Sequence, residues 1–143
     1  MDKMELMTTA EAQTIAAATE FAARLRPRDI VLLTGDLGAG KSVFCRAVIR
    51  ALTGQPDLDV PSPTFTLVQT YEAPLAPLWH FDLYRLKAPE DIFELGWEDA
   101  LSNGILLVEW PERLGGYTPK TALSVTITQE GTTRTITLTG RTS

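Results

Sequence analysis

The chain has 143 residues, of which 44% are hydrophobic and 22% charged, and its formal net charge is −5. This composition is that of one ordinary globular domain, and it argues against a disordered chain, a collagen-like repeat or a coiled coil. The acidic balance also disfavours a protein that grips bare nucleic acid over a large surface. A role in nucleic-acid metabolism would therefore run through protein partners or a small anionic ligand.

No segment is typical of a membrane span or a secretion signal. The longest uncharged stretch, Val60 to Tyr71, contains two prolines and falls well short of the ~20 apolar residues that a spanning helix needs. Acidic residues occupy the N-terminus, where a signal peptide is basic. The one cysteine, Cys45, cannot form an internal disulfide or a cysteine-based metal cluster. We therefore expect a cytoplasmic protein without membrane contact.

The first predicted elements are a helix, a buried strand and a second helix. Thr8 and Glu11 have the spacing of a capping box, which predicts a helix from there to about Leu25. The apolar run 30–33 is typical of a buried parallel strand. After a glycine-rich turn, residues 41–52 again have the periodicity of a helix.

The second half of the chain predicts further strands and a terminal hairpin. Strands are expected at 65–68, 78–83 and 105–108, a helical stretch from Pro89 with breaks at Gly96 and Gly104, and an antiparallel hairpin over 123–138 with its turn at Gly131. In 78–83, alternation places Trp79 and Phe81 on one face and His80 and Asp82 on the other. Apolar strands with helices between them predict one α/β domain over residues 1–143, a sandwich with a mixed sheet.

Residues 35–42 match the complete phosphate-binding loop pattern G-x-x-x-x-G-K-[ST]. The matching residues are Gly35, Asp36, Leu37, Gly38, Ala39, Gly40, Lys41 and Ser42. The glycines let backbone N–H groups approach phosphate oxygens, and the positive N-terminus of the following helix faces the same anion. Lys41 is expected to contact the β and γ phosphates, and the Ser42 hydroxyl to bind Mg²⁺.

The alternative, a simple glycine-rich turn, is disfavoured because a predicted strand precedes the loop and a predicted helix follows it. Guanine specificity normally requires an Asn-Lys-x-Asp element, which the sequence lacks. We therefore predict that the loop binds ATP.

Two acidic residues, Asp82 and Glu109, come at the carboxyl ends of predicted strands, where ligands bind in α/β sheets. Glu109 follows an apolar run, as a Walker B carboxylate does, and either acid suits Mg²⁺ or the attacking group. Each is otherwise a surface charge that ends a strand. Thr64 in the loop Ser62–Pro63–Thr64 is a candidate to meet the γ-phosphate and Mg²⁺, as switch loops do in GTPases, or is part of a proline turn.

Four other residues have two readings each. Trp110 stacks on a base or ribose, or packs in the core. Arg134, beside the hairpin turn, is interpreted either as a phosphate contact or as a solvated surface charge. His80 is more simply a structural hydrogen-bonding residue than a catalyst, and Cys45 more simply a small buried side chain.

Taken together, four segments resemble the bacterial TsaE family, the P-loop ATPases of tRNA threonylcarbamoyladenosine synthesis. They are GDLGAGKS (35–42), SPTFTLV (62–68), HFDLYRL (80–86) and LVEWP (107–111). Their order and separations match those of the family, so that the resemblance covers roughly residues 8 to 140. The middle two segments make it specific, because many families share the P-loop. One departure is Ser42, where the family usually has Thr, but both side chains carry the hydroxyl that Mg²⁺ needs.

The resemblance implies a P-loop NTPase-like three-layer sandwich with a mixed, mainly parallel sheet, weak Mg²⁺-dependent ATPase activity and dependence on partners. In that family the chain docks on a TsaB–TsaD pair, and TsaD transfers the threonylcarbamoyl group to tRNA. The ATP cycle of TsaE is thought to reset the complex between turnovers, so tRNA is contacted only indirectly.

The same resemblance implies roles for individual residues. Lys41 would contact the phosphates, and Ser42 and Glu109 would bind Mg²⁺. Asp82 would support the metal or the water, and Thr64 would belong to a switch-like loop. The remaining assignments place Trp110 beside the nucleotide and Thr9 or Glu11 near the base, with Arg134 as a phosphate contact.

Two other functions remain open on sequence alone. A small-molecule P-loop kinase would normally carry an Arg-rich lid, whereas the basic residues after Glu109 are scattered: Arg113, Lys120, Arg134 and Arg141. A nucleotide-binding assembly factor would sense ATP without cleaving it.

Overall fold

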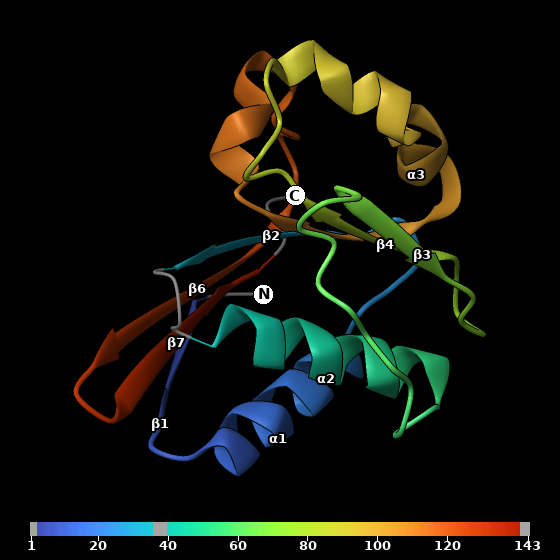
Figure 1. Ribbon diagram of the computed structural model, residues 1–143. Coiled ribbons are helices and arrows are strands. Elements are labelled where there is room, and N and C mark those ends of the chain that lie inside the picture. Colours follow the sequence, from blue (N-terminus) through green and yellow to red (C-terminus); the bar gives the residue numbers. More distant parts are fainter. Residues whose placement is uncertain (1–2, 36–39, 141–143) are drawn as a thin grey trace.

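The computed structural model describes residues 3–35 and 40–140, and within them seven strands form one mixed sheet (Figure 1). The strand order is β1-β7-β6-β2-β5-β4-β3. The strands are β1 (Met4–Thr8), β2 (Ile30–Gly35), β3 (Val68–Tyr71), β4 (Leu78–Asp82), β5 (Ile105–Glu109), β6 (Leu123–Glu130) and β7 (Thr133–Thr139). The four central strands β6, β2, β5 and β4 are parallel to one another, and their outer neighbours pair antiparallel.

Helices cover both faces of this sheet, which gives three layers (Figure 1). On one face lie α1 (Glu11–Ala22) and α2 (Lys41–Thr53), and on the other the 3₁₀-helices η1 (Pro89–Leu95) and η2 (Pro111–Tyr117) with α3 (Trp97–Asn103). The predicted α/β sandwich with a mixed sheet and a C-terminal antiparallel hairpin is thus confirmed. In the described part of the chain, no helix has both the length and the apolar character needed to cross a bilayer.

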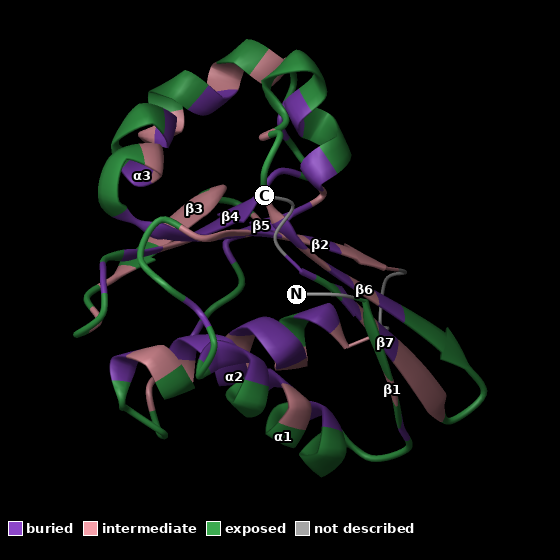
Figure 2. Ribbon diagram, turned by 180° about the vertical axis from the view of Figure 1, so that it is seen from behind, coloured by how far each residue is buried: buried purple, intermediate pink, exposed green. Residues whose placement is uncertain are grey.

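Two hydrophobic clusters hold the layers together. Phe44 and Val48 of α2 belong to the cluster on the α1–α2 face, and α2 is mostly buried while much of α1 is exposed (Figure 2). Phe81 and Trp97 belong to the cluster on the opposite face, where their rings meet edge to face at 5.2 Å between centroids. Because successive strand residues point to opposite faces, His80 shares the α2 side of β4 with Leu78. This alternation decides which side chains of β4 can reach the site.

The predicted capping box at Thr8 and Glu11 is wrong. Thr8 is the last residue of β1, and its hydroxyl lies 3.0 Å from that of Thr14. The N-cap of α1 is Ala10, without a side-chain hydrogen bond. Pairing of β1 with β7 holds Thr8 in extended backbone, so tertiary structure overrides the local signal. The α-helix also ends at Ala22 rather than near Leu25, although a further turn follows.

The strand predicted at 65–68 begins instead at Val68. The Leu67 N–H donates to the carbonyl oxygen of Pro63 at 2.8 Å, and Leu67 has φ +68°. These features close a turn after Pro63, which residues 64–66 occupy in place of a strand. Phe65 has strand propensity but is 82% exposed, with the Arg85 guanidinium 4.7 Å from its ring centroid. The turn places Thr64 beside the ends of the central strands.

Gly35 ends β2 where the backbones of β2 and β6 lie close together. Its φ is +153°, and a Cβ there would lie 2.3 Å from the carbonyl oxygen of Ile127. We expect Gly35→Ala to lower the free energy of unfolding by more than about 1 kcal/mol, because the strands must separate locally. Urea unfolding measures the loss. Gly116→Ala is the control, since a Cβ at Gly116 meets no atom within 4 Å. An equal loss in both variants would contradict the steric explanation.

Candidate functional site

The candidate site lies at the carboxyl ends of the parallel strands. Asp82 of β4 pairs in register with Glu109 of β5, and Glu109 pairs in register with Leu33 of β2. The two acids are therefore level with the end of the strand that leads into the phosphate-binding loop. This edge of a parallel sheet is where α/β proteins bind ligands.

The phosphate-binding loop joins β2 to α2. Its first residue, Gly35, ends β2, and its predicted members Asp36, Leu37, Gly38 and Ala39 lie outside the described residues. Gly40, with φ +106°, is the N-cap of α2, and Lys41 is the first residue of that helix. The N-terminus of α2 thus opens onto the end of the sheet, as the loop pattern predicts.

A cavity of about 310 Å³ brings most of the predicted site residues together. It is lined by Gly40, Lys41, Ser42, Val43, Ser62, Thr64, Asp82, Glu109, Trp110 and Arg134. Val43 and Ser62 are the members that sequence reasoning did not assign to the site. Residues that span the chain from Gly40 to Arg134 therefore form one surface.

Two cationic side chains of this cavity form no close ion pair among the described residues. Lys41 is only 6% exposed, and its Nζ lies over the Trp110 ring, 4.3 Å from the centroid. The buried Nε of Arg134 has no hydrogen-bond partner in residues 3–35 and 40–140. The Arg134 side chain lies beside Gly40, where a Cβ would come within 3.3 Å of its Cδ and Nε. Buried donors without an acceptor are costly, so this pair fits an anion such as a phosphate group.

Two carboxylates face the same cavity. Asp82 and Glu109 are both buried. Burial raises the pKa of Asp82 above its ordinary value, the Tyr84 backbone N–H at 3.1 Å partly opposes this, and the nearby Glu109 raises it further. With the Ser42 hydroxyl they form a set of oxygen donors, which are the ligands that Mg²⁺ prefers. A divalent cation would also offset the repulsion between the two acids.

The raised pKa of Asp82 means that its charged form destabilises the free protein. A group whose pKa is raised on folding favours the native state at low pH, and this contribution is lost as the pH rises through the folded pKa. We expect Asp82→Asn to unfold at higher urea concentration than wild type at neutral pH without Mg²⁺. The gain should shrink in acid, where the wild-type carboxyl is also neutral. Asp57→Asn, in an exposed turn, is the control. Lower stability of Asp82→Asn at neutral pH would contradict the burial argument.

The loop that carries Thr64 is attached to β4. The Ser62 and Thr64 hydroxyls lie 2.8 Å apart, and both residues line the cavity. The Asp82 backbone N–H donates to the carbonyl oxygen of Leu67 at 2.9 Å. The hydroxyl pair is therefore held next to the acidic end of β4.

His80 contacts Glu109 directly, which sequence reasoning did not assign. His80 Nε2 lies 2.7 Å from Glu109 Oε2, and both side chains are buried. The Nδ1 atom of His80 has no hydrogen-bond partner in the described part of the chain. The hydrogen bond orients the Glu109 carboxylate, as expected of a structural hydrogen-bonding histidine. The available signal was the alternation in β4, which places His80 and Asp82 on one face.

Trp110 lies at the mouth of the cavity in an uncommon conformation. It follows β5 with φ +58°, in the left-handed region, where a bulky residue is strained. Its ring is half-buried and lies 4.8 Å from that of Tyr84, centroid to centroid. Strain of this kind persists where the surroundings hold the residue in place, and it is frequent at ligand sites.

Thr9 and Glu11 do not line this cavity. Thr9 is exposed, and its backbone N–H donates to the Gln13 side chain at 2.7 Å. Glu11 lines a separate cavity of about 380 Å³ between α1 and α2, with Ile15 and Arg46 among its neighbours. A contact of Thr9 or Glu11 with the base of a nucleotide stays a prediction from the resemblance.

Comparison with known proteins identifies relatives over most of the chain. The family model described as "Threonylcarbamoyl adenosine biosynthesis protein TsaE" matches residues 8–136. A relative in Rickettsia bellii named "tRNA threonylcarbamoyladenosine biosynthesis protein TsaE" is 45% identical over 86% of this chain and 85% of its own. The Bacillus subtilis protein of the same name is 34% identical over 92% and 81%. The crystal structure of Bacillus subtilis YdiB superposes with a TM-score of 0.76 at 30% identity, covering 97% of this chain and 86% of that one.

Proposed function

The chain belongs to the TsaE family of tRNA threonylcarbamoyladenosine biosynthesis proteins, and from this we propose that it binds and hydrolyses ATP in that process. The observation that carries the proposal is the cavity at the carboxyl ends of the central strands. There two cations that form no close ion pair within residues 3–35 and 40–140 adjoin two buried carboxylates and a hydroxyl, the groups that a nucleotide triphosphate with Mg²⁺ requires.

Each side chain has a chemical task in this proposal. Lys41 and Arg134 bind phosphate oxygens, and their positive charges neutralise the negative charge of the phosphate groups, which water solvates in the free nucleotide. Ser42, Asp82 and Glu109 supply the oxygen ligands of Mg²⁺, and the bound ion would stabilise the charge that develops on the phosphates.

The attack of water on the γ-phosphate needs a proton acceptor that is held in a fixed orientation. Glu109 is that group in our proposal. His80, on the neighbouring strand β4, holds its carboxylate by a hydrogen bond, and Glu109 lines the cavity. The attacking oxygen forms a bond to phosphorus while the bond to ADP breaks. Thr64, on its tethered loop, is placed to contact the γ-phosphate or the ion.

We further propose that hydrolysis depends on a TsaB–TsaD pair and that the chain resets this complex rather than transferring the threonylcarbamoyl group. The net charge of −5 supports an indirect relation to tRNA, because an acidic protein has little electrostatic attraction for a polyanion.

The test is Mg²⁺-dependent ATP hydrolysis by the purified chain, alone and with a matching TsaB–TsaD pair. We expect slow hydrolysis alone and a marked increase with the pair. If the pair has no effect while ATP still binds, the partner-gated role is wrong. A screen of metabolites as phosphate acceptors would then test for a small-molecule kinase.

Variants of Trp110 separate the role of its ring from the strain of its backbone. Trp110→Ala and Trp110→Gly both remove the ring, but only Gly adopts a positive φ without strain. We expect both variants to bind ATP with equally reduced affinity, and the Gly variant to be more stable than the Ala variant by about 1 kcal/mol. Calorimetric titration and urea unfolding measure the two effects. Wild-type affinity with lower stability would instead make Trp110 a packing residue.

A further inference from the structure

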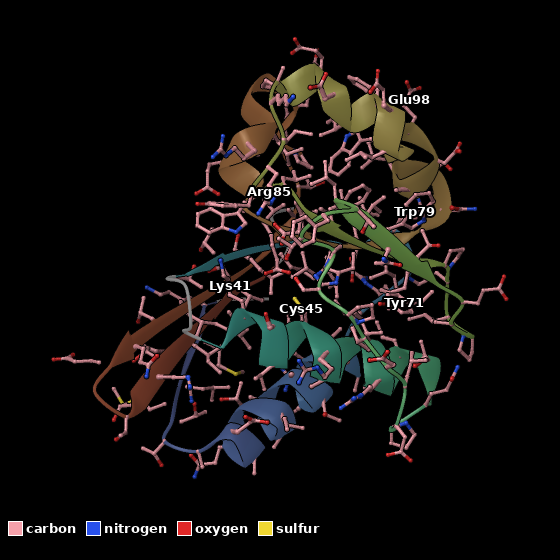
Figure 3. All side chains as sticks on the ribbon, in the orientation of Figure 1. Lys41, Cys45, Tyr71, Trp79, Arg85 and Glu98 are labelled. Atoms are coloured by element: carbon pink, nitrogen blue, oxygen red, sulfur yellow. The ribbon has the colours of Figure 1, made fainter. Side chains whose placement is uncertain are left out.

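A second group of potential ligands lies one helical turn below Lys41. Cys45 follows Lys41 by four residues on α2, so both side chains emerge from the same face of the helix. Its sulfur points toward the sheet (Figure 3) and is 1% exposed. A cysteine in this place is beneath the nucleotide cavity rather than in it.

Two side chains of the sheet approach Cys45 from the other side. His80 comes from β4 and Glu109 from β5, which are adjacent parallel strands, and both side chains are on the face that α2 covers. One sulfur, one imidazole nitrogen and one carboxylate oxygen of these residues all lie within 4.8 Å of one another. All three residues are buried; His80 is 3% exposed and Glu109 is 6% exposed.

We propose that Cys45, His80 and Glu109 form a binding site for a thiophilic divalent cation of the Zn²⁺ type. Thiolate, imidazole and carboxylate are the three protein ligands that Zn²⁺ takes in four-coordinate sites. The oxygen-only set around Ser42 suits a hard ion such as Mg²⁺, whereas the sulfur of Cys45 selects a softer one. The two sites are therefore chemically distinct although they share Glu109.

The charges around the sulfur have mixed signs. The carboxylates of Glu109 and Asp82 attract a cation, and the ammonium of Lys41 opposes it. Burial raises the pKa of the Cys45 thiol, so without an ion this side chain is neutral. Binding then replaces the thiol proton, which passes to solvent, and separates His80 from Glu109 so that both can face the ion.

A small cavity adjoins two of the three proposed ligands, His80 and Glu109, and has room for a water ligand. Its volume is about 80 Å³, and its walls include His80, Glu109, Ser42 and Ser62. A single water molecule needs far less space than this. Arg46 also lines the cavity, and its positive charge opposes a cation there, which the negative charges of the thiolate and the Glu109 carboxylate must offset.

Occupation of this site would inhibit the activity proposed above, because an ion between Cys45 and His80 reorients the Glu109 carboxylate that the reaction uses. An ion bound to Cys45 draws the Glu109 carboxylate away from Mg²⁺ and from the attacking water. This consequence rests on the proposed ATPase function, whereas metal binding itself does not.

Co²⁺ is the probe for binding, because it replaces Zn²⁺ and its complexes with thiolate have a charge-transfer absorption. The chain contains one cysteine, so any such band is assigned without ambiguity. We expect wild type to develop the band with a one-to-one end point, and Cys45→Ser, which preserves the size of the side chain, to lack it. Cys45→Ala repeats the comparison without a hydroxyl. A wild-type chain without the band, or a wild-type band that does not reach a one-to-one end point, would overturn the site.

Zn²⁺ titration of ATP hydrolysis at constant Mg²⁺ tests the consequence. We expect wild type and Cys45→Ser to be equally active without Zn²⁺, and wild type to be inhibited at a Zn²⁺ concentration at least about tenfold lower. Equal sensitivity would show that Zn²⁺ acts only at the nucleotide metal, and would overturn the inhibitory role. If wild type hydrolyses no ATP, the proposed function fails, while the Co²⁺ spectra still decide the metal site.

Discussion

Lys41→Ala is expected to abolish nucleotide binding while leaving the free protein folded. Hydrogen bonds to charged groups contribute about 1.5–3 kcal/mol each, so the loss of one phosphate contact weakens ATP binding roughly 10- to 100-fold. Lys41 is proposed to contact two phosphates, so we expect its removal to weaken ATP binding at least about 100-fold. The loss should appear as a missing calorimetric signal and as a melting temperature that ATP no longer raises.

The same substitution should not destabilise the free chain. Lys41 is buried without an ion pair in the described residues; its ammonium lies over the Trp110 ring and is attracted at longer range by the Asp82 carboxylate. Removing a desolvated charge offsets the loss of that contact. Lys87→Ala, at an exposed position outside the cavity, is the matched control and should bind ATP as wild type does. Wild-type affinity in Lys41→Ala would refute the phosphate assignment.

Glu109→Gln is expected to lose ATP hydrolysis while ATP still binds. Glutamine has the shape of glutamate and can keep the hydrogen bond to His80, but it is neutral and cannot accept a proton from water. The loss of one electrostatic group aimed at the reacting centre reduces kcat by about 10²–10³-fold. Single-turnover hydrolysis with the TsaB–TsaD pair, beside calorimetric ATP binding, measures the two properties separately.

The outcome for Glu109→Gln also distinguishes an ATPase from an assembly factor. If hydrolysis stops and tRNA modification continues through many turnovers, ATP is only a structural ligand. Glu112→Gln, three residues along the chain and exposed, should hydrolyse ATP normally. Equal losses in both variants would mean that surface charge, rather than the Glu109 position, limits the reaction.

The sequence predicts the central strands well because their signals are local. The runs 30–33 and 105–108 are apolar throughout, which is typical of parallel strands covered on both faces, and both are strands in the structure. The acids that follow strands were predictable for a similar reason. Parallel strands end at one edge of a sheet, so Asp82 and Glu109 had to lie near the phosphate-binding loop once the strands were parallel.

The failures involve contacts between residues far apart in the chain. Strand β1 pairs with β7, and no local sequence pattern near Thr8 indicates that this segment pairs with Thr133–Thr139. The contact of His80 with Glu109 likewise depends on β4 lying next to β5, which alternation within one strand does not specify. The turn after Pro63 replaces a strand because its hydrogen bond is local, and the exposed Phe65 ring contacts the Arg85 guanidinium instead of a neighbouring strand.

The strand order has a consequence for the time at which the site forms during synthesis. Strand β1 is made first and pairs with β7, which is made last, and Arg134 of the cavity belongs to β7. Strand β6 must also be in place to cover the edge of β2 that precedes the phosphate-binding loop. Until β6 and β7 have joined the sheet, a folding chain therefore lacks part of the cavity. The pocket proposed for ATP is therefore complete only after the hairpin of β6 and β7 has been synthesised, which makes it one of the last parts of the fold to form.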